Sequence, residues 1–508
     1  SWRVTNAKPD AKWQTAEFDD AKWEKATVVA KLGASPWGNV FAAAAAKKAG
    51  NGKRPSTGSV AAPETLVLQP GFKAELLYTV PRAEQGSWVS LVADPKGDFI
   101  AGDQGGTLWH VSMKDANKPV ATKIETSLVG AHGLLYAHGA LYALTAEKGK
   151  GDLWRLRDPK GDNSYSEQTK LRSFQGSGEH GPHQLILDPK DGSILIVAGN
   201  HTKMPADEVP APAHRWDEDD LLKKFEDPNG HAVGIKATGG WIGRVDRDGK
   251  NFRAVTTGFR NAYDLSRAPD GDLFVYDSDM EWDMGAPWYR PTRIYLATEG
   301  GELGWRSGSG NNQPMVLDAQ PALVDVGPGS PTGSTLGLGA KFPAKYQRAF
   351  FACDWTYATL YAIHLTPNGG GWTATKEVFA GGKPFSVTDV IIRPQDGHMY
   401  VTIGGRGGQS ALYRITYTGT ESTASVDWYA STPEQKLRRE LEALRLQPAS
   451  AANLAKGWSL LGHADRWVRF AARQLVEAQP VEGWRARVAA PHANGEAAVN
   501  AALALARC

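Results

Sequence analysis

The sequence predicts a mainly β protein: a six-bladed β-propeller, preceded by a partial β-sandwich segment and followed by an α-helical array. One strand-turn-strand pattern recurs six times between about residue 88 and residue 418. The 56 Gly, 30 Pro and 18 Trp, in a chain of which 22% is charged, suit many short strands joined by tight turns. After Tyr417 the apolar period changes from that of a strand to that of a helix.

Each repeat joins two apolar runs through a Pro/Asp/Gly turn and adds a third strand. The six copies span residues 91–111, 133–156, 184–200 (closed by 240–245 after an insertion), 264–279 (closed by 291–296), 342–365 and 390–417. Radial repetition of such sheets around a channel protects strand edges. We therefore predict a propeller domain over residues 64–420.

The N-terminal part differs from the repeats. Residues 1–40 interleave apolar and aromatic residues with polar ones in short bursts, which predicts short strands. They are too few to bury a core, so we expect the end of a β-sandwich whose earlier strands are missing. The segment resembles the last strands of galactose-binding-like jelly rolls. Residues 41–63 are rich in Ala, Gly, Lys, Ser and Pro and form the predicted linker.

Residues 430–508 have helical periodicity. Thr432 is a predicted N-cap with Pro433 in the first turn, and an apolar stripe follows at Leu437, Leu441 and Leu444. Residues 463–478 and 495–507 resemble HEAT-type repeats, and the spacing that carries this likeness is that of Asp465, Val468, Arg469 and Ala472. Because repeat arrays cover their terminal faces, we expect this incomplete array to continue beyond Cys508.

Composition limits the partners. Lys and Arg number 57 against 55 acidic residues, and no dense basic block is present, so no nucleic acid partner is expected. No run of about 18 apolar residues occurs, and no membrane-spanning segment is expected. The chain begins at Ser1, which favours removal of an export signal and a periplasmic or extracellular location, with membrane association through missing parts.

Residues that precede the innermost strand of each blade converge at one end of a propeller channel. This rule selects one set of candidates: Trp88, His132, His180, His183, Arg260, Asn261, Tyr263 and Asp389. Such a ring could hold an acid-base pair and an anion-stabilising cation around one ligand. The alternative is a channel that is polar because water fills it.

Two histidines flank a Gly-Pro turn in the segment 178–185, GEHGPHQL. His180 and His183 would be presented by a rigid backbone, where an imidazole can accept a proton near neutral pH. A general base is the preferred hypothesis. Metal ligation and hydrogen bonding to the turn are the alternatives.

Four acidic residues alternate along the segment 276–285, at Asp277, Asp279, Glu281 and Asp283. In an extended chain they share one face, and carboxylates so close together need a cation. Calcium, which takes several oxygen ligands, is the predicted ion. Alternatively, Arg290 and Arg293 neutralise the cluster, or the segment is a hydrated loop.

These motifs resemble the glucose/sorbosone dehydrogenase propeller over residues 64–418. Soluble members of that family oxidise sugars with pyrroloquinoline quinone and calcium. The resemblance implies that His180 takes the hydroxyl proton and that Arg260 stabilises the developing charge. It also implies a calcium site at the acidic segment and a place beside the cofactor for Asn261. His132, His183 and Asp389, which the ring of pre-strand positions selects, are the other candidate cofactor-binding residues.

Three cofactor positions depart from that family. Ala131 and His132 stand where a glutamine is expected, residues 383–390 lack the expected paired arginines, and residues 354–361 lack the expected lysine. A tricarboxylate cofactor without those cations should bind poorly.

Almost the whole chain resembles large proteins of the PVC-type haem-binding, or membrane-bound dehydrogenase, family. The likeness lies in residues 258–265, 276–294, 301–308, 327–333 and 404–417. It implies a sandwich, a propeller, HEAT repeats and a c-type cytochrome that accepts the electrons. Cys353 and Cys508 cannot form a CxxCH motif, so haem c would lie outside this chain or on a partner. The predicted function is oxidation of a sugar or related alcohol. The alternatives are a non-catalytic scaffold that binds glycan or protein, and a calcium-dependent, lactonase-like hydrolase.

Overall fold

The computed structural model describes residues 3–4, 19, 21–25, 59–146, 150–176, 178–205, 233–279, 290–306, 317 and 319–508. The chain divides into two compact units, Ser1–Pro55 and Ser56–Cys508. In the first unit, β1 (Arg3–Val4) pairs antiparallel with β2 (Glu24–Lys25). The predicted jelly-roll segment otherwise lies outside the described residues and stays a prediction.

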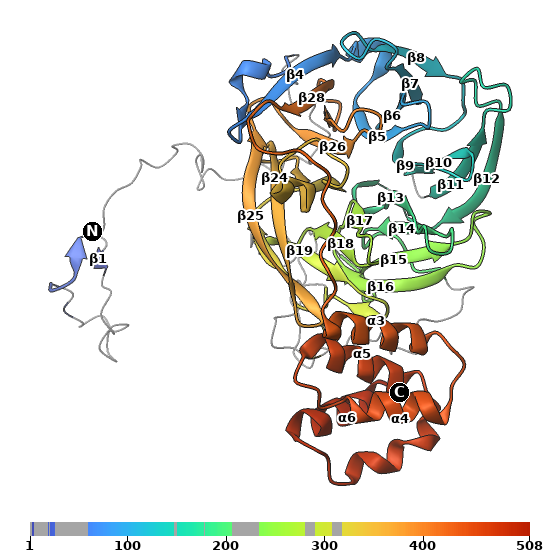
Figure 1. Cartoon of the computed structure of the whole chain (residues 1–508), viewed down its shortest axis with the longest axis vertical. Coiled ribbons are helices and arrows are strands. Elements are labelled where there is room, and N and C mark those ends of the chain that lie inside the picture. The colour runs from blue at the N-terminus through green and yellow to red at the C-terminus, as the bar shows by residue number, and fades with distance from the viewer. Residues whose placement is uncertain are drawn as a thin grey trace. The chain divides into compact units, whose positions relative to one another are not determined.

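The second unit contains the predicted six-bladed propeller, and four strands per blade run outward from the channel (Figure 1). The innermost strands are β5 (Trp88–Ala93), β9 (Ala131–Ala137), β13 (Pro182–Leu187), β17 (Leu265–Arg267), β22 (Pro331–Leu336) and β26 (Val387–Ile392). The second strands are β6 (Phe99–Asp103), β10 (Ala140–Thr145), β14 (Ile194–Ala198), β18 (Leu273–Asp277), β23 (Ala349–Asp354) and β27 (Met399–Ile403).

The third strands are β7 (Leu108–Ser112), β11 (Gly151–Arg157), β15 (Gly240–Val245), β19 (Thr292–Ala297), β24 (Thr359–Asn368) and β28 (Ala411–Tyr417). The outermost strands are β8 (Val120–Ile124), β12 (Glu167–Phe174), β16 (Arg253–Phe259), β21 (Val324–Gly327), β25 (Gly371–Gly381) and β4 (Phe72–Thr79). Two short strands extend blades three and five: β20 (Gly301–Glu302) beside β16, and β3 (Val67–Leu68) beside β25.

The ring closes by pairing the two ends of the propeller sequence. Strand β4 forms the outer edge of blade six by pairing antiparallel with β28. Arg414 secures this edge, since its Nε and Nη2 donate to Glu75 Oε2 at 3.0 and 2.9 Å. This closing strand lies before the first repeat in the sequence.

The cores lie between blades. Strand β14 is buried along its whole length and β6 is buried except at Asp103, because both faces of each inner sheet pack against neighbouring blades. Between blades two and three, Trp241 packs at 5.2 Å, edge to face, against Phe252. Rigid packing of this kind fixes where each inner strand begins, and therefore fixes the channel mouth.

The short helices α1 (Arg82–Gln85) and α2 (Ala344–Gln347) belong to the propeller, and four longer helices follow it. These are α3 (Pro433–Arg445), α4 (Ala451–Ser459), α5 (Arg466–Glu477) and α6 (Gly495–Arg507). Thr432 caps α3 in a capping box with Gln435, as predicted for the N-cap. The HEAT assignment of this array stays a prediction. No helix in the described part of the chain is both long and apolar enough to cross a bilayer.

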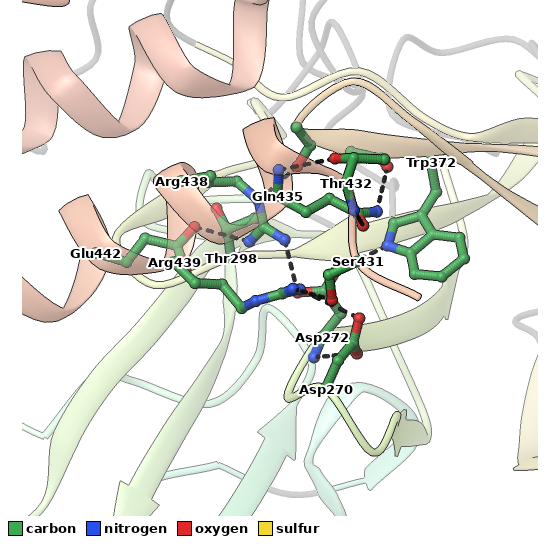
Figure 2. A network of polar contacts seen from close by, with 12 residues as sticks. Asp270, Asp272, Thr298, Trp372, Ser431, Thr432, Gln435, Arg438, Arg439 and Glu442 are labelled. Carbon is green, nitrogen blue, oxygen red and sulfur yellow. Dashed lines mark hydrogen bonds and ion pairs between the residues drawn. The ribbon is translucent and has the colours of Figure 1, made fainter. Parts of the chain in front are cut away.

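Helix α3 docks on blades four and five through a buried polar network (Figure 2). The guanidinium of Arg438 donates to Asp272 Oδ1 at 2.6 Å, to Glu442 Oε1 at 2.8 Å and to the carbonyl of Gly370 at 2.6 Å. Trp372 Nε1 donates to the other oxygen of Asp272 at 2.7 Å. Each buried charge has a partner of opposite sign, so the network fixes the first helix to the propeller.

Candidate functional site

Three successive residues, at or directly before the start of each inner strand, occupy equivalent places in all six blades. The first of them, the mouth position, lines a cavity at the start of the strands. The six mouth positions are Val89, His132, His183, Tyr263, Thr332 and Thr388. The third residue of each triplet lines a second cavity, farther along the strands: Leu91, Leu134, Leu185, Leu265, Ser334 and Val390. The channel therefore has two cavities, of about 380 Å³ at the mouth and about 390 Å³ at the opposite end.

The middle residue of the triplet, the clamp position, has in three blades a side chain that accepts backbone amides of its own blade and of a neighbouring blade. Asp389 accepts the amide of Val390 at 2.8 Å and that of Leu91, in blade one, at 2.7 Å. Asp264 accepts Leu265 N–H at 2.7 Å and Ser334 N–H at 2.5 Å. Gln184 makes the same pair of contacts with Leu185 and Leu134. These side chains close the ring with hydrogen bonds to the backbone.

Beside the mouth ring, the mouth cavity is lined by charged and aromatic side chains from the turns around it. Among them are Glu179, His180, Arg260, Trp355 and Arg406. They come from blades three, four, five and six, so the cavity collects polar groups that are far apart in the sequence.

His180 ends the short 3₁₀ turn η2 (Gly178–His180) and is buried. Its Nδ1 lies 2.6 Å from Asn200 Oδ1, and an amide oxygen accepts, so Nδ1 carries the proton and Nε2 is the basic ring atom. Burial, followed by the nearby Arg260 guanidinium and His201, holds the pKa of His180 well below its ordinary value. The ring is therefore neutral at neutral pH.

Arg260 and Asn261 are held by one carboxylate. Asp277 Oδ2 accepts the backbone N–H of Arg260 at 2.9 Å, and Oδ1 accepts that of Asn261 at 2.7 Å. The Arg260 side chain is buried and donates to Ser278 Oγ at 3.3 Å. Asn261 reaches blade three, because its Nδ2 donates to the carbonyl of Glu179 at 3.0 Å and its Oδ1 accepts from His183 Nε2 at 3.0 Å.

Three rings stack at the mouth. The centroids of His183 and Tyr263 are 4.4 Å apart, and the planes of His132 and His183 lie within 4° of parallel at 5.9 Å. Burial lowers the pKa of His132 to about 4 and that of His183 to about 3. Both imidazoles are neutral, so the stack adds flat, uncharged surface to the cavity.

The structure brings together most of the predicted ring, but Trp88 does not line the cavity: it is buried against Tyr78, and the next residue, Val89, lines the cavity instead. His132, His180, His183, Arg260 and Asn261 all line the mouth cavity. Their predicted roles stay predictions.

Asp389 lies elsewhere: it occupies a clamp position and lines the opposite cavity. The residue of blade six that is equivalent to His183 is its neighbour Thr388, which lines the mouth cavity. A shift of one residue turns a strand side chain to another face.

The acidic segment is only partly described. Both oxygens of Asp277 accept backbone amides, and burial raises its pKa to about 7. Asp279 forms an ion pair with Arg293, the neutralising partner that the alternative hypothesis named. Glu281 and Asp283 lie outside the described residues.

Four residues of the site were not identified from the sequence: Glu179, Asn200, Trp355 and Arg406. Glu179 forms an ion pair with Arg406 across the mouth, and the Arg406 guanidinium lies 5.2 Å from the ring of Trp355. The sequence offered one signal for Arg406: it is the single cation among the four glycines of GGRGG, residues 404–408. The others lie on turns whose proximity depends on the closed ring.

The described residues of the mouth cavity and of the acidic segment do not fit the implied cofactors. Arg260 and Arg406 are the two cations among the described residues that line the mouth cavity, and Glu179 already pairs with one of them. This set does not fit a quinone with three carboxylates. Calcium would have to displace backbone amides from Asp277 and Arg293 from Asp279, so these two residues do not form a ready calcium site.

No protein-family model matches the chain, and no curated protein sequence matches it. The chain is similar to a solved glucose dehydrogenase at 18% identity and a TM-score of 0.50, over 69% of this chain and 100% of that one. It is also similar to the PQQ-bound aldose sugar dehydrogenase of Streptomyces coelicolor at 14% identity and a TM-score of 0.48, over 69% of this chain and 100% of that one. The PQQ domain of the Coprinopsis cinerea pyranose dehydrogenase matches at 11% identity and a TM-score of 0.49, over 69% of this chain and 97% of that one. At these identities the likeness to the first structure shows the propeller fold.

Proposed function

We propose that the chain is an oxidoreductase that oxidises a sugar or related alcohol in the mouth cavity. One observation carries the proposal: a buried, neutral histidine and a buried arginine from neighbouring blades line the same cavity. That pairing supplies a proton acceptor and a cation beside one ligand, as alcohol oxidation needs.

His180 is the proposed base. Asn200 fixes the protonated Nδ1, so that Nε2 takes the proton of the substrate hydroxyl. Arg260 stabilises the alkoxide that develops, and its fixed backbone, held by Asp277, keeps it in place before the substrate binds. The low pKa of His180 keeps the base unprotonated into the acidic range.

Oxidation also needs an acceptor for the hydride, in contact with the reacting carbon. The mouth cavity does not match a tricarboxylate quinone in charge, so no step is assigned to that cofactor. We propose that the electrons finally reach a c-type cytochrome domain or partner outside this chain, in the periplasm or outside the cell. A calcium requirement would depend on Glu281 and Asp283.

A dye-linked assay tests the proposal. The chain is incubated with aldoses, alditols and sugar acids and an artificial acceptor, with and without pyrroloquinoline quinone and calcium. Turnover is expected with at least one sugar, and His180→Gln should lower kcat about 100-fold or more. The control is His364→Gln, a histidine paired with Glu377 in blade five, which should leave kcat unchanged. Loss of less than about tenfold in His180→Gln would remove the assigned base.

Lactone hydrolysis is the second candidate. The two cations described at the mouth cavity do not fit a quinone with three carboxylates, and hydrolysis needs no such cofactor. The same histidine could activate water and the same arginine could stabilise the oxyanion, with no hydride acceptor. Hydrolysis of an aldonolactone without any dye, lost in His180→Gln, would identify this reaction. Sugar binding with neither turnover would instead support the non-catalytic scaffold.

A further inference from the structure

An ion pair spans the mouth of the channel. Arg406 belongs to the loop between β27 and β28 in blade six, and Glu179 belongs to the turn η2 that precedes β13 in blade three. In a ring of six, blades three and six face each other across the channel. Both side chains line the mouth cavity, so the pair lies over the proposed site.

The backbone beneath Arg406 is fixed. The N–H of Gly405 donates to Ser87 Oγ at 2.9 Å, and Trp355 Nε1 donates to the carbonyl of Gly404 at 2.6 Å. The N–H of Arg406 itself donates to the side-chain oxygen of Gln104. The arginine therefore extends from a loop that three hydrogen bonds hold, and rotation of its side chain is enough to break the pair.

Opening this pair costs little. The side chains of Arg406 and Glu179 are 57% and 54% exposed. Ion pairs so exposed to water typically contribute about 0–1 kcal/mol. A carboxylate brought by a ligand could replace that of Glu179 without loss, because the guanidinium fork suits any carboxylate.

The charge of the cavity indicates how many carboxylates the ligand carries. Among the described lining residues, Arg260 and Arg406 are positive and Glu179 is negative. The three histidines are uncharged, since burial keeps the pKa of each well below its ordinary value. The balance is one positive charge, which matches a ligand with one negative charge and not one with three.

We propose that the Glu179–Arg406 pair is a crossbar over the mouth, and that the substrate is a sugar acid with one carboxylate, of the uronic acid class, which takes the place of Glu179 on Arg406. This inference rests on the proposed oxidation and names its substrate class. The uronate carboxylate would lie at the rim, and a hydroxyl of the same ring would extend inward to His180. A neutral sugar would leave the crossbar closed.

Equilibrium binding tests the inference without any electron acceptor. Titration calorimetry with D-glucuronate and D-glucose is carried out on the whole chain. Glucuronate is expected to bind about tenfold tighter or more than glucose. Arg406→Gln should remove that preference and change glucose binding by less than about twofold. Glu179→Gln should tighten glucuronate several-fold, because a competing carboxylate is gone. Arg157→Gln, an exposed arginine of β11, is the control and should change neither affinity.

The opposite results overturn the inference. These are equal affinity for the two sugars, an equal effect of Arg406→Gln on both, or weaker glucuronate binding in Glu179→Gln. Failure to bind either sugar also overturns it. The dye-linked assay then decides separately about the activity: turnover of another alcohol would leave the proposed function standing, and glucuronate binding without any oxidation would remove the function alone.

Discussion

The two ends of the channel hold cavities of nearly equal volume that differ in chemistry. At the mouth, histidine, tyrosine and arginine side chains face the cavity. At the opposite end, the carboxylates of Asp264 and Asp389 are occupied by backbone amides of two blades each. The residues concerned are neighbours in the same strands. The volume of a cavity therefore does not identify the site. The polar and aromatic side chains that line the mouth cavity do.

The largest expected effect separates the two ends by activity. Arg260→Gln removes the cation at the mouth and should lower kcat about 10²–10³-fold, because the alkoxide loses its stabilising charge. Arg267→Gln is the matched control: Arg267 lines the opposite cavity and pairs with Asp188 at 3.1 Å. Equal losses of kcat in the two variants would contradict the distinction between the ends.

The second effect separates the ends by stability. Asp389→Ala leaves the buried amides of Val390 and Leu91 without acceptors and should lower the free energy of unfolding by roughly 3 kcal/mol. Denaturant unfolding followed by tryptophan fluorescence measures it. Asp115→Ala, at an exposed turn, should cost much less. If Asp389→Ala instead abolished kcat while stability was unchanged, Asp389 would belong to the site.

The smallest effect is a pH dependence of the mouth stack. The pKa of His132 is about 4 in the folded chain, against 6.5 ordinarily, because of burial. The unfolded chain therefore binds a proton that the folded chain excludes, and stability from this residue is lost as the pH falls below about 6.5.

Between pH 7.5 and pH 5 His132 should account for a loss of about 2 kcal/mol, so the wild type should lose about that much more than His132→Gln, in which His180 and His183 still contribute. Chemical denaturation at the two pH values gives the difference. A parallel fall in the wild type and the variant would mean that His132 is protonated in the folded chain.

The fold was largely predictable. Alternating apolar residues and Pro/Asp/Gly turns identified six blades, and the Thr432 cap located the first long helix. The closing strand β4 was not identified, because it pairs with β28 across more than three hundred residues of sequence. In blade five the repeat was recognised from residue 342, and the inner strand β22 lies before it. Pairing at a distance leaves no local periodic signal.

The site was predictable at the inner strands and at the turns directly before them, where His180, Arg260 and Asn261 lie. His132 and His183 were found because their positions repeat from blade to blade. Asp389 was misplaced by one residue, because the pairing register of β26 shifts between Val387 and Asp389 and no sequence pattern marks that shift. Glu179 and Arg406 meet only because the ring brings blade three opposite blade six, which no spacing in the sequence encodes.

A crystal structure of the chain with a bound sugar or its aldonolactone product tests the central claim most directly. The account predicts the ligand in the mouth cavity, with one oxygen within hydrogen-bonding distance of His180 Nε2, about 2.6–3.2 Å, and near the guanidinium of Arg260. A ligand in the opposite cavity, or at the mouth with both side chains out of reach, would contradict it.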